Sequence, residues 1–194
     1  MGRKGDHTRE YIKETAYALF VQKGYKDVTM KDVCEETGLS RGGLYRHFGS
    51  TAELFEEIWR ELVDDSARGL EESILRGESA TVILRELLEK RRKKMEDGER
   101  ALSLSIYEYC HAVNSRLFCE LNSQSKEMWQ RLIRYGVQRG EFLRVDTEAV
   151  VDLILYSYQG VRMWSRILPV DQGVSRHITD CIWKILVGEE KGES

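Results

Sequence analysis

The sequence predicts an all-α protein of about nine helices, and three observations support that fold class. The 194 residues contain a single proline, they are rich in residues that favour helices, and they have few β-branched runs. Apolar residues recur at helical spacing in one segment after another. The chain is long enough to bury a core. We expect a three-helix head at residues 5–65, a helical body at residues 66–188 and a frayed tail at residues 189–194.

A first helix is expected from about Arg9 to Lys23, where Gly24 ends it. Its apolar stripe consists of Ile12, Ala16, Leu19 and Phe20. We expect this stripe to pack against the back of the two helices that follow.

Residues 29–48 have the layout of a helix-turn-helix motif, in which a turn joins two short helices. Thr29 can cap the first helix, and Asp32 completes a weak capping box. Gly38 supplies the left-handed residue that ends this helix, and Ser40 caps the second one.

The second helix of the motif exposes more residues than it buries. Leu44 and Phe48 face inwards, whereas the outward residues are Arg41, Gly42, Gly43, Tyr45, Arg46 and His47. Such a surface contributes little to folding. It suits a close approach to DNA phosphates and base edges.

A long fourth helix should begin at the capping box of Ser50 and Glu53, continue towards Ile74 and connect head to body. Five further helices are expected in the body, at about residues 81–95, 99–112, 115–139, 147–168 and 173–187. Gly140 ends the third of these helices and Pro169 ends the fourth.

The window from Thr8 to about Leu62 resembles the N-terminal domain of the TetR family of transcriptional regulators. The matching residues are Ile12, Ala16, Leu19, Phe20, Gly24, Tyr25, Val28, Thr29, Val33, Gly38, Leu39, Ser40, Gly42, Leu44, Tyr45, His47, Phe48, Glu53, Leu54 and Phe55. The rest of the chain resembles the family only in length and helical character. The resemblance implies double-stranded DNA as a partner, with DNA contacts at Thr29, Arg41, Gly42, Tyr45 and His47.

The full set of predicted DNA contacts adds the neighbouring polar positions and comprises Thr29, Lys31, Ser40, Arg41, Gly42, Gly43, Tyr45, Arg46, His47 and Thr51. Thr51 departs from the family, which usually carries a lysine there and uses it on a phosphate. Thr51 still offers a hydroxyl and backbone N–H groups at a helix start, but the charge is missing. We therefore expect either a lower affinity or a larger contribution from Lys4, Lys31 and Arg41.

The helix at 147–168 is apolar around much of its circumference, so it needs two partners to pack on. We expect the second partner to be another copy of the chain, in a twofold dimer with a four-helix interface. The predicted interface residues are Val151, Ile154, Tyr158, Gly160, Ile178, Ile182 and Ile185. Such a homodimer would read a palindrome with half-sites about 34–36 Å apart, or a multiple of that distance. The alternative is that both helices are central in one monomeric core.

The resemblance also implies a cavity for a small-molecule effector in the body. The candidate ligand contacts are Tyr107, Trp129, Tyr156 and Arg162, and Arg162 would suit an anionic group. The alternative is that the aromatic residues fill the core and that Arg162 lies at a rim.

Charge and hydropathy narrow the class of protein. Residues 1–50 hold nine Lys and Arg against seven Asp and Glu, whereas the remaining 144 residues hold twenty-one against twenty-six. A mildly basic head on an acidic body fits a DNA-binding protein. No stretch approaches the ~18 apolar residues of a membrane span, and the start lacks a signal region. We expect a cytoplasmic protein that does not contact the membrane.

The four cysteines, Cys34, Cys110, Cys119 and Cys181, are scattered without a zinc or disulfide spacing. We expect reduced thiols, and the alternative is a redox sensor built on Cys110 and Cys119. His111 and His177 have no neighbouring ligand set, so we expect neither a metal nor a cofactor.

These observations predict a repressor that a small molecule releases from a palindromic operator. One alternative is a regulator that needs no effector or is controlled by a protein partner, and an activator is also compatible with the sequence. A helical enzyme is a remote alternative, because the sequence contains no Gly-x-Ser-x-Gly motif, no metal-ligand pair and no phosphate loop.

Overall fold

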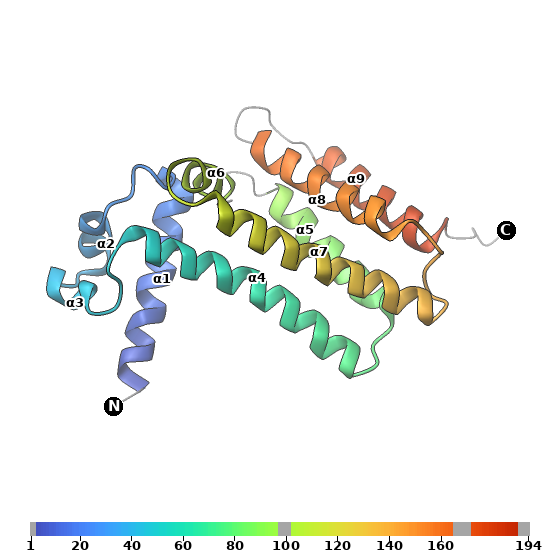
Figure 1. Ribbon diagram of the computed structural model, residues 1–194, viewed down its shortest axis with the longest axis horizontal. Helices are drawn as coiled ribbons and strands as arrows, with labels where there is room; N and C mark the ends of the chain where they lie inside the picture. Colours follow the sequence, from blue (N-terminus) through green and yellow to red (C-terminus); the bar gives the residue numbers. More distant parts are fainter. Residues whose placement is uncertain (1–2, 97–101, 165–171, 190–194) are drawn as a thin grey trace. The chain divides into compact units, whose positions relative to one another are not determined.

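The computed structural model of the protein describes residues 3–96, 102–164 and 172–189. Over these residues it contains nine helices and no strand (Figure 1), which confirms the predicted all-α fold. The helices are α1 Arg3–Lys23, α2 Met30–Thr37, α3 Arg41–Tyr45, α4 Thr51–Leu75, α5 Ala80–Glu96, α6 Ser103–Ala112, α7 Ser115–Gln138, α8 Thr147–Trp164 and α9 Gln172–Val187. The predicted helix end at Pro169 and most of the predicted tail lie outside the described residues.

The chain divides into two compact units. The head unit comprises α1, α2, α3, α4 as far as Asp64, α6, and α7 as far as Leu121. The body unit comprises α4 from Asp65, α5, α7 from Asn122, α8 and α9. The sequence predicts α6 as part of the body, whereas the structure places it in the head unit.

Aromatic rings form the centre of the head unit. Phe20 of α1 and Phe55 of α4 meet edge to face, with ring centroids 5.0 Å apart. Tyr109 of α6 is fully buried, and its ring centroid lies 5.1 Å from that of Phe55. The other predicted stripe residues of α1, Ile12, Ala16 and Leu19, are buried in the same cluster. α6 belongs to the head unit because Tyr109 completes this core.

The helix-turn-helix motif forms through local hydrogen bonds. The Thr29 hydroxyl accepts a hydrogen bond from the Asp32 N–H at 3.2 Å, and the Asp32 carboxylate accepts one from the Thr29 N–H at 2.9 Å. Hydrogen bonds from the side chains of Thr29 and Lys23 hold the pKa of the Asp32 carboxyl well below its usual range. Gly38 ends α2 at a φ of +69°, a left-handed conformation that favours glycine. The predicted capping box is therefore present.

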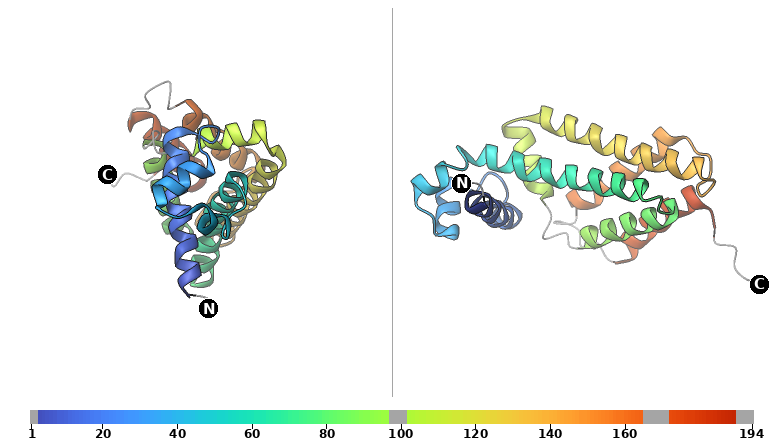
Figure 2. Two further views of the ribbon diagram at one scale, coloured as in Figure 1. Left: turned by 90° about the vertical axis from the view of Figure 1, so that its left-hand side faces the viewer. Right: turned by 90° about the horizontal axis from the view of Figure 1, so that it is seen from below.

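In the body unit, α5 lies alongside α9 (Figure 2) and also packs against α8. Trp129 and Leu132 of α7 are fully buried among these helices. Gly136 permits a close approach of the chain, because a Cβ there would lie 2.3 Å from the Phe142 ring. Phe142 therefore folds back onto α7 directly after that helix ends.

Candidate nucleic-acid interface

The outward side of α3 is a polar surface held in place by two buried residues. Leu44 and Phe48 are almost completely buried, and they anchor a helix of only five residues, Arg41–Tyr45. The predicted contacts Ser40, Arg41, Gly42, Tyr45 and Arg46 are exposed, and Gly43 and His47 are half-buried. Sequence periodicity therefore placed the two faces of this segment correctly.

Arg41 and Arg46 are the free cations of this surface. Neither forms an ion pair with another residue in the described part of the chain. A Cβ added at Gly42 would meet no atom within 4 Å, so this side of the helix is open to a close partner. Two unpaired guanidinium groups beside open backbone suit phosphate and base-edge contacts.

Gly43 has a different role from Gly42. Its backbone N–H donates a hydrogen bond of 3.1 Å to the Ser40 hydroxyl, which caps α3. A Cβ at Gly43 would lie 3.2 Å from the same hydroxyl oxygen. Gly43 is therefore part of the N-cap of α3, whereas Gly42 leaves room for a partner to approach the helix closely.

Thr29 and Lys31 extend the exposed surface onto the start of α2. The Thr29 hydroxyl already accepts a hydrogen bond from the Asp32 N–H in the capping box, so a DNA contact of this hydroxyl would add to that bond. Lys31 is exposed, and its ammonium nitrogen lies 3.5 Å from a carboxylate oxygen of Glu35, one turn further along α2. An exposed pair of this kind is weak, so Lys31 can turn to a phosphate at little cost.

Thr51 starts α4 and is half-buried. Burial raises the pKa of the nearby Tyr25 hydroxyl, and a hydrogen bond from the Thr51 side chain opposes that rise. The adjacent cap matches the prediction in part: the Glu53 N–H donates to the Ser50 hydroxyl at 3.1 Å, but the Glu53 carboxylate accepts, at 2.7 Å, from the N–H of Gly49 rather than from that of Ser50. The Thr51 side chain therefore lies close to the Tyr25 hydroxyl.

The head unit is similar to a known family of proteins. A profile of the family described as "Bacterial regulatory proteins, tetR family" matches residues 12–58, from α1 to the first part of α4. YfiR of Bacillus subtilis (strain 168), an uncharacterised helix-turn-helix transcriptional regulator, is 31% identical over 151 residues, which cover 75% of this chain and 73% of that protein. The chain belongs to the TetR family.

Other TetR-family proteins match over similar lengths. The repressor KstR2 of Rhodococcus jostii is 27% identical over 144 residues, which cover 73% of this chain and 70% of that protein. A TetR regulator of Chloroflexus aurantiacus is 26% identical, with a TM-score of 0.69 over 94% of this chain and 96% of that one. A TetR-family regulator of Agrobacterium tumefaciens has a TM-score of 0.76 at 14% identity over 94% of this chain and 99% of that one, and it shows the fold alone.

TetR-family proteins are DNA-binding regulators rather than enzymes, which decides against the helical-enzyme alternative. No helix in the described part of this TetR-family chain has the length and apolar character needed to cross a membrane. Among these residues, no group of three or more His, Cys, Asp or Glu side chains lies close enough together to hold a metal ion. All four cysteines are free thiols, of which Cys119 and Cys181 are exposed.

The predicted effector contacts lie on three helices of this TetR-family chain, α6, α7 and α8. Tyr107 is an exposed residue of α6 in the head unit, and Tyr156 is an exposed residue of α8 in the body unit. Trp129 is fully buried in α7, and the Arg162 side chain lies outside the described residues. An aromatic residue at helical spacing identifies a helix, but it does not show which layer of the fold the ring enters.

Trp129 is nevertheless unusual among the buried residues. Its indole N–H has no hydrogen-bond acceptor within the described segments. The Arg91 guanidinium carbon of α5 lies 5.0 Å from the Trp129 ring centroid and 4.6 Å from that of Tyr158 on α8. A buried polar group without a partner is costly in a native core, so this N–H is a candidate contact for a bound molecule.

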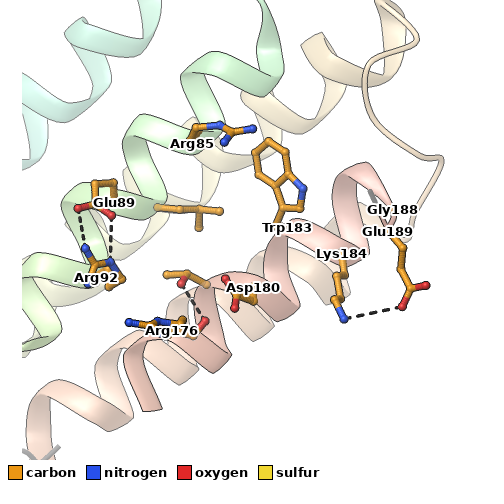
Figure 3. Close-up of a pocket in the computed structure, with 11 residues that line it drawn as sticks. Arg85, Glu89, Arg92, Arg176, Asp180, Trp183, Lys184, Gly188 and Glu189 are labelled. Carbon is orange, nitrogen blue, oxygen red and sulfur yellow. Dashed lines mark hydrogen bonds and ion pairs between the residues drawn. The ribbon is translucent and has the colours of Figure 1, made fainter. Parts of the chain in front are cut away.

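Sequence reasoning missed a groove between α5 and α9 in the body unit, with a volume of about 850 Å³ (Figure 3). The Arg85 guanidinium carbon lies 4.7 Å from the Trp183 ring centroid, and Arg92 is held by Glu89 at 2.7 Å. Lys184 lies 3.7 Å from Glu189. Several of the charged side chains that line the groove are therefore paired with one another. Helical periodicity carries no signal for it, because its lining is simply the rim where two helices meet.

The predicted dimer residues divide into two groups. Val151, Ile154 and Ile182 are buried in the core of their own chain, so this part of the prediction needs correction: they hold the body unit together and offer no surface to a second copy. Tyr158, Gly160, Ile178 and Ile185 remain half-buried. The exposed large apolar residues on the same two helices are Leu153, Tyr156, Met163, Trp164 and Val174.

Proposed function

We propose that this chain is a cytoplasmic repressor that binds a palindromic operator as a homodimer and leaves the operator when a small molecule binds the body unit. The DNA-binding part rests on one observation. Arg41 and Arg46 form no ion pair in the described part of the chain, and they lie beside Gly42, where no other atom blocks a close approach to the helix. Repression is favoured by the relatives, because KstR2 of Rhodococcus jostii and AcnR of Corynebacterium efficiens are both named as repressors.

Selection of bound fragments from the source genome tests the DNA-binding part. We expect enrichment of a palindrome whose half-sites lie on one face of the duplex, about 34–36 Å apart or a multiple of that distance. The affinity should fall steeply as salt is raised, because phosphate contacts release counterions. A protein that binds no duplex at low ionic strength would overturn the proposal.

The dimer part is supported by the family, whose members typically act as dimers, and by the apolar surface of α8. Leu153, Tyr156, Gly160 and Trp164 recur at helical spacing, so they share one side of this helix. The surface that we propose for the second copy is therefore this stripe, together with Val174 of α9. It replaces the buried positions Val151, Ile154 and Ile182.

The effector part is supported by the buried N–H of Trp129 and the guanidinium of Arg91 over the same ring. An acceptor oxygen on a mostly apolar molecule would supply the missing hydrogen bond, and a carboxylate would also attract Arg91. Of the four residues predicted from sequence, Trp129 is the one that we retain as an effector contact.

A thermal-shift screen with apolar carboxylic acids and their amides tests the effector part. A true effector should raise the melting temperature of the free protein and lower its affinity for the selected duplex. Trp129→Phe keeps the ring, removes the N–H and should weaken both effects. The second candidate function is a regulator without a small-molecule effector, which the exposed positions of Tyr107 and Tyr156 favour. A screen in which no compound stabilises the protein or releases DNA would decide for that alternative.

A further inference from the structure

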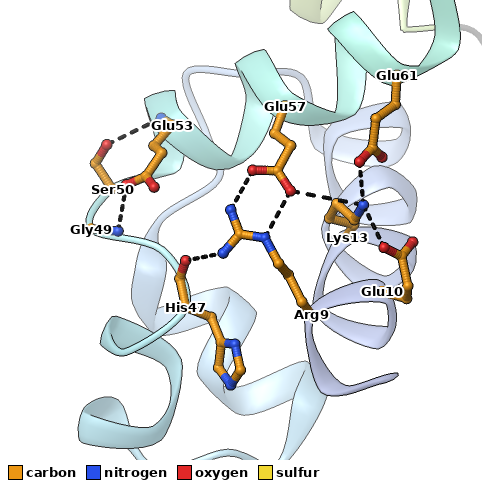
Figure 4. Close-up of polar contacts among 9 residues, drawn as sticks. All are labelled: Arg9, Glu10, Lys13, His47, Gly49, Ser50, Glu53, Glu57 and Glu61. Atoms are coloured by element: carbon orange, nitrogen blue, oxygen red, sulfur yellow. Dashed lines mark hydrogen bonds and ion pairs between the residues drawn. The ribbon is translucent and has the colours of Figure 1, made fainter. Parts of the chain in front are cut away.

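Two cations of α1 face two carboxylates of α4 in the head unit (Figure 4). Arg9 and Glu57 form a bidentate pair: Nε of Arg9 donates to Oε1 of Glu57 at 2.8 Å, and Nη2 donates to Oε2. One turn further along each helix, the Lys13 ammonium group pairs with Glu61. Because Arg9 and Lys13 have the same four-residue spacing as Glu57 and Glu61, each of these cations lies opposite one of these carboxylates.

The remaining side of the Arg9 guanidinium reaches the recognition segment. Nη1 donates a hydrogen bond to the backbone carbonyl of His47, the second residue after α3. The guanidinium carbon lies 4.0 Å from the centroid of the Phe48 ring. One side chain of α1 therefore connects α4 to the C-terminal end of α3.

This connection is important because α3 is short. A helix of five residues has little stability of its own, and the carbonyls at its end lack partners within the helix. The chain from α3 to α4 passes through Gly49 and Ser50, whose hydrogen bonds to Glu53 fix the start of α4 and not the end of α3. The bond from Arg9 to the His47 carbonyl fixes this end of α3 from outside the helix.

Lys13 stabilises the partner of Arg9. It is only 5% exposed, and its ammonium nitrogen lies 2.7 Å from Glu10 and 3.8 Å from Glu57. A buried ammonium group needs carboxylate neighbours to offset its desolvation. Lys13 therefore places a second positive charge beside Oε1 of Glu57, the oxygen that accepts from Arg9 Nε, and so favours the ionised carboxylate that Arg9 binds.

We propose that Arg9 is a positioning residue for DNA recognition: it fixes the end of α3 against α4 through His47 and Glu57 without touching DNA itself. This inference rests on the proposed DNA-binding function. It also separates Arg9 from the contact cations Arg41 and Arg46, because the guanidinium of Arg9 is already committed to three groups of the head unit.

Arg9→Met tests the proposal, because methionine keeps an apolar stem beside Phe48 and removes the hydrogen bonds. The probe is a duplex selected from a random pool by the wild-type protein, with a scrambled duplex as the non-specific partner. We expect the Kd for the selected duplex to rise about tenfold, because the hydrogen bond that fixes the end of α3 is lost. The Kd for the scrambled duplex and the salt dependence should not change, because no phosphate contact is lost. Arg60→Met removes an exposed arginine of α4, paired with Glu120 at 3.2 Å, and is the matched control.

Glu57→Gln separates positioning from simple charge. Removal of a carboxylate makes the head more basic, so electrostatics alone predicts tighter binding to every duplex. Positioning predicts weaker binding to the selected duplex, because Arg9 loses its bidentate partner. Glu120→Gln makes the same charge change at an exposed site and should bind the selected duplex at least as tightly as the wild type.

Three results would overturn the proposal. Unchanged affinity of both Arg9→Met and Glu57→Gln would show that the contact is not needed. A salt dependence reduced by about one phosphate contact would make Arg9 a direct DNA ligand. An equal loss for both duplexes at an unchanged melting temperature would show that Arg9 does not act on specific recognition. Should Arg9→Met unfold, Arg9→Lys keeps the charge without the fork, and the same loss of specific affinity is expected. Failure of the wild type to bind any duplex would instead refute the proposed function.

Discussion

The Ser105 hydroxyl of α6 donates a hydrogen bond of 2.7 Å to the Phe20 carbonyl at the end of α1. Ser105 is buried, and one turn later Glu108 accepts a hydrogen bond of 3.1 Å from the Lys26 N–H. These two bonds join α6 to the loop that leads into the helix-turn-helix motif. They explain why α6 belongs to the head unit, although some 80 residues of sequence separate the partners.

Ser105→Ala should lower the free energy of unfolding by about 1 kcal/mol, because a buried hydroxyl donor is lost while the Phe20 carbonyl keeps its bond from Gly24. Urea unfolding followed by circular dichroism measures the change. Ser123→Ala, at an exposed position of α7, should have almost no effect. Equal losses in the two variants would show that the bond to Phe20 contributes nothing.

Glu141 should make the stability of the body unit depend on acid pH. Burial raises the pKa of its carboxyl, but hydrogen bonds from Ser79, Arg139 and the Thr81 N–H outweigh burial and hold the pKa at about 2. The unfolded-state pKa is about 4.3, so the stabilisation is complete above that pH and is lost as the pH falls towards about 2.

Glu141→Gln should therefore melt at a lower temperature than the wild type at neutral pH, and the difference should shrink as the pH approaches about 2. Thermal unfolding across this pH range measures it. Glu127→Gln, at an exposed position of α7, is the control and should follow the wild type. A difference that stays constant with pH would mean that the Glu141 carboxylate is not the titrating group.

Arg41→Ala and Tyr45→Phe should each weaken binding to the selected duplex by about 1–3 kcal/mol without a change in melting temperature. Both side chains are exposed and leave the buried residues Leu44 and Phe48 in place. Fluorescence anisotropy with labelled duplex gives the affinities. If neither variant binds more weakly than the wild type, these two residues do not belong to the contact set.

Thr51→Lys should tighten binding to all duplexes and steepen the salt dependence by about one phosphate contact. It should also destabilise the protein slightly, because Thr51 is half-buried and its polar contact with the Tyr25 hydroxyl is lost. Salt titrations of the affinity test the first expectation and thermal unfolding tests the second. An unchanged salt dependence would place position 51 away from the phosphates.

Gly160→Leu should dissociate the dimer without harming the protomer. A Cβ at Gly160 would meet no described atom within 4 Å, so a larger side chain fits the single chain. Leucine also favours a helix more than glycine does. Sedimentation should show a shift from dimer to monomer at unchanged helicity. A dimer that survives the substitution would move the interface away from this side of α8.

Local signals in the sequence were enough to predict the nine helices of the described residues and the polar face of α3. The cap of Thr29 and Asp32, the turn at Gly38 and the inward pair Leu44 and Phe48 all act within a few residues of one another. Hydrogen bonding and helical periodicity at that range depend little on the rest of the fold. The reciprocal charges of α1 and α4 could also have been found, since Arg9 and Lys13 share the four-residue spacing of Glu57 and Glu61.

Only the tertiary structure decided which groups separated in sequence come together. It turned Val151 and Ile154 into the core of their own chain, left Leu153 and Tyr156 exposed, and joined Arg9 to the His47 carbonyl. An apolar stripe shows that a helix must be covered, but the same stripe fits a neighbour in the chain or a second copy equally well. The choice depends on how all the helices pack, because burial is a property of the assembled core and not of one segment.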